Sequence, residues 1–96
     1  MNKYESIIII NPSLAEQGIK EVITKFTDLI NSNDNGKTIK VEEIGKKKLA
    51  YEINKQSEGY YTVYTFEAKP EFISELERIY RITDSIMKFI TIRKED

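Results

Sequence analysis

The 96-residue chain contains no cysteine and no histidine. Without cysteine it can form neither a disulfide framework nor a thiolate metal site, which suits a cytosolic protein. Without histidine it lacks the commonest general base and the commonest metal ligand. We therefore expect no metal, no cofactor and no small-molecule substrate.

Long apolar runs are also missing. No stretch approaches the roughly 20 apolar residues of a membrane span. The first five residues are too polar for a signal peptide, and the isoleucine run at 7–10 is too short for its apolar region. We therefore expect a cytoplasmic protein with no membrane partner. An apolar content of 40% and a charged content of 32% suit one globular domain over residues 1–96.

The net charge of −1 conceals an alternating pattern along the chain. Residues 37–55 and 81–94 each carry a net charge of +3, whereas residues 1–36, 56–80 and 95–96 are net acidic. If the two basic segments lie together in the fold, the near-neutral total hides a positive region suited to a polyanion.

The densest positive charge is the lysine run at 46–48, inside a segment that otherwise alternates like a strand. Leu49, Tyr51 and Ile53 would share one face of that strand, so the lysines are expected on a rigid ribbon. A lysine run can equally be a solvated face that guards an edge strand against aggregation. This stretch alone does not decide between that role and polyanion binding.

The remaining pattern predicts alternating strands and helices. A capping box is expected where Ser13 would accept a hydrogen bond from the Glu16 amide, and Gly45 predicts a bend in a long strand. The predicted elements are a strand at 4–10, a helix to about residue 31, a long strand at 37–54, a strand at 60–68, a helix opened by Pro70 and a strand at 86–92. This β-α-β-β-α-β order predicts a ferredoxin-like α+β sandwich, with two helices on one face of a four-stranded antiparallel sheet.

The second face of that sheet has no helix to cover it. Tyr61 and Val63 would lie there, with Ile7 and Ile9 or their neighbours. An exposed apolar and aromatic patch on a small domain usually marks a partner surface, although singly scattered surface hydrophobes are the alternative.

Enzymatic motifs are absent from the sequence: it has no nucleophile elbow, phosphate loop or paired metal motif. We therefore expect a protein that is not an enzyme. A free-standing module that binds single-stranded RNA on the open sheet face is an alternative, because residues 59–64 faintly resemble the third strand of an RNA-recognition motif. Glu58 and Thr62 depart from that signature.

A second resemblance extends along almost the whole chain. Its residues are Tyr4-Glu5, Asn11-Pro12, Gly45-x-Lys47-x-Leu49-Ala50-Tyr51-x-Ile53-x-Lys55, Gly59-Tyr60, Phe66, Leu76, Arg81-Ile82-x-Asp84 and Lys88. In this order and at these spacings, the chain resembles the S-six family of the bacterial small ribosomal subunit.

The resemblance implies a non-catalytic ribosomal protein. Such a protein binds the central domain of small-subunit ribosomal RNA together with ribosomal protein S-eighteen. The RNA-binding residues that it implies are Lys3, Tyr4, Lys47, Tyr51, Arg81, Lys88 and Arg93. The residues expected to face the protein partner are Leu49, Ala50, Ile53, Tyr61 and Val63. Tyr4 and Tyr51 would either stack on bases or riboses, or serve as core or rim rings.

Overall fold

The computed structural model describes residues 1–32, 36–53 and 55–94. Within them, the elements follow the predicted order. They are β1 (Asn2–Ile10), α1 (Glu16–Asn31), β2 (Gly36–Ile53), β3 (Gln56–Ala68), α2 (Pro70–Ile82) and β4 (Ile86–Lys94). The hairpin connection predicted at residues 54–59 is shorter than expected, because β3 already begins at Gln56; Asn54 lies outside the described residues.

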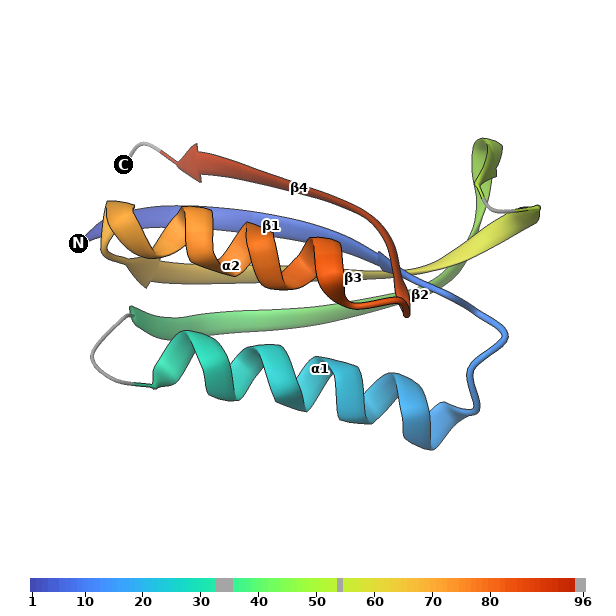
Figure 1. Ribbon diagram of the computed structural model, residues 1–96, viewed down its shortest axis with the longest axis horizontal. Helices are drawn as coiled ribbons and strands as arrows, with labels where there is room; N and C mark the ends of the chain where they lie inside the picture. Colours follow the sequence, from blue (N-terminus) through green and yellow to red (C-terminus); the bar gives the residue numbers. More distant parts are fainter. Residues whose placement is uncertain (33–35, 54, 95–96) are drawn as a thin grey trace.

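The strands form one antiparallel sheet in the order β2-β3-β1-β4. Both helices lie on the same face of the sheet, as predicted for a ferredoxin-like fold (Figure 1). The far half of β2 and the start of β3 extend beyond the sheet as a hairpin, at the end opposite the start of β1 (Figure 1). The predicted architecture is therefore confirmed.

The core fills the space between the helices and the sheet. Alternate side chains of a strand point to opposite faces, so Ile8 and Ile10 of β1 are completely buried toward the helices. The other completely buried large side chains include Phe26, Ile30, Tyr64, Phe66 and Leu76. On β3 this confirms the predicted division, with Thr62, Tyr64 and Phe66 on the helix side.

The predicted capping box at the start of α1 is wrong. The helix begins at Glu16, and its N-cap residue Ala15 makes no side-chain capping bond. Ser13 instead donates hydrogen bonds from its backbone N–H, at 3.0 Å, and from its hydroxyl to Oδ1 of Asn11. An asparagine that accepts a bond from the N–H two residues later forms its own turn. Because this turn engages both the N–H and the hydroxyl of Ser13, Ser13 does not cap the helix.

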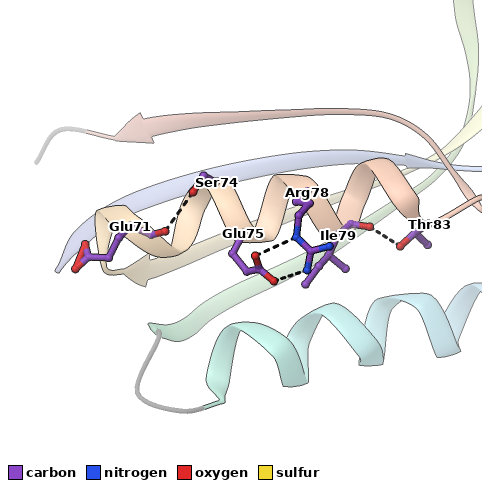
Figure 2. Close-up of polar contacts among 6 residues, drawn as sticks. All are labelled: Glu71, Ser74, Glu75, Arg78, Ile79 and Thr83. Carbon is purple, nitrogen blue, oxygen red and sulfur yellow. Dashed lines mark hydrogen bonds and ion pairs between the residues drawn. The ribbon is translucent and has the colours of Figure 1, made fainter.

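Glu75 and Arg78 form an ion pair on the exposed surface of α2 (Figure 2). Arg78 donates to both carboxylate oxygens of Glu75, from Nε at 3.1 Å and from Nη2 at 2.6 Å. This hydrogen bonding lowers the pKa of Glu75 and raises the pKa of Arg78. Near the end of the helix, the Thr83 hydroxyl donates to the carbonyl oxygen of Ile79 at 2.6 Å (Figure 2). Arg78 is therefore paired within its own helix.

Because the Tyr64 hydroxyl is buried, we expect the free energy of unfolding to fall at alkaline pH. It donates to the carbonyl oxygen of Ile23 at 2.7 Å, and burial raises the pKa of Tyr64 to about 12. An unfolded tyrosine titrates near pH 10. Below pH 10 the hydroxyl keeps its proton in both the folded and the unfolded chain. Between pH 10 and 12 the unfolded chain loses the proton while the folded chain keeps it. The free energy of unfolding therefore falls by up to about 1.4 kcal/mol per pH unit in this range.

Tyr64→Phe should make this alkaline decline less steep in urea-unfolding series from pH 8 to 11. The decline should not vanish, because burial also raises the pKa of Tyr80. Tyr51→Phe is the matched control, since Tyr51 is 61% exposed. An unaltered decline in Tyr64→Phe would show that Tyr64 does not hold its proton more tightly in the folded state.

Candidate nucleic-acid interface

The hairpin leaves the sheet at Gly45. This glycine has a φ of +99°, and the pairing of β2 with β3 shifts register between Glu43 and Gly45. A Cβ at this position would meet nothing within 4 Å, so the backbone conformation, and not lack of space, favours glycine. The predicted bend in the long strand is therefore confirmed, and it sets the direction of the lysine-bearing hairpin.

The lysine run is divided between the two sides of this hairpin. Lys46 is opposite Tyr60 and lines a hollow with Ile19 of α1, which places it on the helix side. Lys47 is opposite Gly59, and strand alternation points its side chain to the other side, continuous with the open face of the sheet. The lysines thus lie on a paired strand, as expected, but they do not form one surface.

A hollow of about 120 Å³ lies where the hairpin meets the open face of the sheet. Its walls come from β1, β4 and both arms of the hairpin. They consist of Ile9, Leu49, Ala50, Tyr51, Ile53, Tyr61 and Lys88. The structure therefore brings together Tyr51 and Lys88, expected on the RNA side, with four of the five residues expected on the protein side.

Gly59 permits the close approach that shapes this hollow. A Cβ on Gly59 would lie 2.3 Å from Cγ2 of Ile9 and 3.3 Å from Cδ2 of Leu49. Real Cβ atoms do not make contacts as short as the first. The base of the hairpin can therefore rest on β1 only because residue 59 has no side chain.

Lys88 and Tyr51 contact each other directly across the hollow. Lys88 Nζ donates to the Tyr51 hydroxyl at 2.7 Å, joining β4 to a residue 37 positions earlier in the hairpin. The same nitrogen is 5.2 Å from the centroid of the Tyr51 ring. It is much closer to the oxygen, so the ammonium lies at the hydroxyl end of the side chain and leaves the ring exposed.

Arg81 lies on the opposite side of β4 from Lys88. Its guanidinium carbon is 6.0 Å from the centroid of the Phe89 ring. Phe89 packs against the core beneath the helices, whereas its neighbour Lys88 faces the open side. Arg81 and Lys88 therefore flank the same strand, and the edge of β4 carries positive charge on both sides.

Lys3 and Arg93 lie far from Lys88. In the pairing of β1 with β4, Tyr4 is opposite Arg93 and Ile9 is opposite Lys88. Five residues of strand separate the two pairs by about 16 Å. Arg93 Nη2 donates to Oδ1 of Asn2 at 3.4 Å, at the end of the sheet away from the hairpin. The seven predicted RNA-binding residues thus do not form one cluster.

Tyr4 belongs to the core. Its side chain is 7% exposed and stacks on Phe66, with ring centroids 5.8 Å apart. The Tyr4 hydroxyl accepts a hydrogen bond from Asn2 Nδ2 at 3.3 Å. Of the two roles left open by the sequence, the structure contradicts base stacking for Tyr4, because the ring has no free face to offer.

The open face carries an apolar patch larger than the sequence predicted. Val63 is opposite Ile7 on one side, and Ile90 is opposite Ile7 on the other. Ile90 and Ile92 are 49% and 45% exposed. Both residues were absent from the predicted patch, because periodicity does not determine which side chains of the last strand face the helices. Their pairing with β1 does.

In residues 1–32, 36–53 and 55–94, no group of three or more acidic, histidine or cysteine side chains could hold a metal ion. Neither helix in this part of the chain has the length and apolarity needed to cross a membrane.

The fold and the site define a small ferredoxin-like α+β domain with a lysine-bearing hairpin and an uncovered apolar sheet face. A family model described as ribosomal protein S6 matches residues 3–93. The chain is 47% identical to the small ribosomal subunit proteins bS6 of Clostridium novyi (strain NT) and Clostridium perfringens (strain 13 / Type A), over 99% of this chain and 99% of each relative.

The fold agrees equally well with a solved structure. The crystal structure of 30S ribosomal protein S6 from Thermotoga maritima matches with a TM-score of 0.92 and 38% sequence identity, covering 97% of this chain and 87% of that one. The chain belongs to the ribosomal protein S6 family, which confirms the resemblance drawn from its sequence.

Proposed function

We propose that this chain is a structural, non-catalytic protein of the small ribosomal subunit. It binds the central domain of small-subunit ribosomal RNA through the hairpin and the edge of β4, and a second ribosomal protein through the open sheet face. It would act in the cytoplasm, on the ribosome. The observation that carries this proposal is the hollow at the hairpin base, where Tyr51 and Lys88 meet an apolar wall.

The RNA side of the proposal rests on exposed positive charge. Lys47, Arg81 and Lys88 are all exposed, and the last two flank one strand. Lysine and arginine attract phosphates largely by releasing condensed counterions, so their contribution weakens as the salt concentration rises. Tyr51, which is 61% exposed, is also available to contact a sugar or base. Lys3 and Arg93 would make further contacts at the far end of the sheet, one on each of its faces.

The protein side rests on the uncovered apolar surface. Leu49, Ala50 and Ile53 line the hollow with Tyr61, and the exposed Ile90 continues the patch along β4. A contiguous apolar patch with charged residues at its border is typical of a protein interface. Ribosomal protein S-eighteen is the proposed partner.

Co-sedimentation tests the proposal as a whole. The chain, carrying an affinity tag and expressed in its own bacterium, should travel with the small ribosomal subunit through a sucrose gradient and leave it at high salt. A chain that stays at the top of the gradient at low salt would contradict the proposal.

Lys88→Ala should reduce the salt dependence of binding to small-subunit ribosomal RNA. The slope of the logarithm of affinity against the logarithm of salt concentration should become shallower by about one unit, because one phosphate contact is lost. Lys69→Ala removes the same charge at an exposed position before α2 and should leave the slope unaltered. An unaltered slope in Lys88→Ala would remove this lysine from the RNA surface.

Tyr61→Ala, a change on the open face, distinguishes the proposed ribosomal role from the alternative of a free-standing RNA-binding module. If the chain is a ribosomal assembly protein, this change should weaken binding of the protein partner. A loss of RNA affinity with no partner present would instead favour the alternative.

A further inference from the structure

The hydrogen bond between Lys88 and Tyr51 has only one possible direction. An ammonium group has donors and no acceptor, so the Tyr51 oxygen must accept. A tyrosine hydroxyl also carries a proton of its own to donate. Within the described residues, that proton and the two remaining ammonium protons of Lys88 have no acceptor.

These free protons lie side by side. Lys88 Nζ and the Tyr51 oxygen are 2.7 Å apart, so donors from the two groups can reach neighbouring oxygens of one phosphate. The apolar side chains of Ile9, Leu49 and Ile53 line the hollow beside them. The contact between the two residues is exposed, so a phosphate can reach both groups from solvent.

We infer that Tyr51 and Lys88 form one composite site for a single RNA phosphate. The ammonium supplies the charge and fixes the Tyr51 hydroxyl by donating to it, and the hydroxyl donates its proton to the same phosphate. Tyr51 is then a hydrogen-bond donor whose orientation depends on Lys88. The site is complete only when the hairpin lies against the sheet, since the two residues come from different elements. This inference rests on the proposed binding of ribosomal RNA.

If the composite site exists, Tyr51→Phe should weaken RNA binding in a different way from the loss of a positive charge. This change keeps the aromatic ring and removes only the hydroxyl, so stacking on a base would be preserved. Affinity for small-subunit ribosomal RNA, measured by filter binding with ribosomal protein S-eighteen present at several salt concentrations, should fall by about five- to tenfold at each of them, a typical net cost of one hydrogen bond. The salt slope should stay unaltered, because no cation is lost.

The double variant Tyr51→Phe/Lys88→Ala tests whether the two residues act together. It should bind no more weakly than Lys88→Ala alone, because without the ammonium the hydroxyl is no longer held in place. Tyr60→Phe is the matched control, since the Tyr60 hydroxyl donates to Glu43 on the helix side of the hairpin and its loss should leave RNA affinity unaltered. Urea unfolding of each variant confirms that all remain folded.

Three outcomes are distinguishable. The composite site is supported if Tyr51→Phe lowers RNA affinity by the same factor at every salt concentration and the double variant binds no more weakly than Lys88→Ala. Wild-type affinity in Tyr51→Phe, or independent and additive losses, overturns it while leaving the proposed function intact. If the wild-type chain shows no salt-dependent binding to the RNA with ribosomal protein S-eighteen present, the proposed function fails and the composite site fails with it.

Discussion

Tyr4→Ala is expected to lower the free energy of unfolding by about 3–5 kcal/mol, the range found when a buried aromatic ring is truncated to alanine. The ring is 7% exposed and stacks on Phe66 beneath the helices, so its removal leaves a cavity between β1 and β3. Domains of this size have total stabilities of about 5–15 kcal/mol. The change should therefore leave the fold marginal in urea-unfolding experiments.

Two companion variants isolate the cause. Tyr4→Phe keeps the ring and loses only a hydroxyl that accepts a 3.3 Å hydrogen bond from Asn2, so it should cost about 1 kcal/mol or less. Tyr51→Ala removes a ring of the same type that is 61% exposed, and it should also cost about 1 kcal/mol or less. If Tyr4→Ala kept wild-type stability but lost RNA affinity, Tyr4 would be a surface ring and its packing against Phe66 would be wrong.

Gly59→Ala should destabilise the chain by about 1–3 kcal/mol, as expected for an atom forced into a packed site. The new Cβ would lie 2.3 Å from Cγ2 of Ile9, on the central strand β1. Either β1 or the hairpin must move. Because Tyr51 is carried by that hairpin, its contact with Lys88 should be lost as well, and RNA affinity should fall at least to the level of Tyr51→Phe.

The clash itself can be tested by relieving it. Ile9→Ala removes the methyl group that Gly59→Ala would meet, so the double variant should lose less stability than the sum of the two single variants. Additive losses would show that the hairpin base is not packed on Ile9. Gly45→Ala is a useful comparison on the same strand, because its cost would come from the φ of +99° and not from contact.

Much of the fold could be predicted because it depends on local periodicity. The isoleucine run of β1 and the alternation in β3 determine which side chains face the helices, and Gly45 and Pro70 mark a bend and a helix start. The start of α1 was mispredicted because two local hydrogen-bonding patterns compete for Ser13, and the Asn11 turn forms in place of the capping box.

The site was harder to predict because it depends on contacts between distant residues. Tyr51 and Lys88 were both expected on the RNA side. However, no sequence pattern indicates that the two residues, one in the hairpin and one in β4, form a hydrogen bond with each other. Lys88 and Arg93 are five positions apart on β4, which separates them by about 16 Å along the strand and places them on opposite faces, so their shared positive charge did not mean a shared site. The apolar Ile90 and Ile92 were missed because β4 has isoleucine or phenylalanine on both faces.

The pairing of Lys3 with Lys94 has a practical consequence. It brings the start of β1 and the end of β4 together at the pole remote from the lysine-bearing hairpin (Figure 1). A fluorescent label or surface tether joined at either of these strand ends would leave the hollow unobstructed. Immobilised protein could therefore present its hairpin freely to a dissolved nucleic acid or polypeptide.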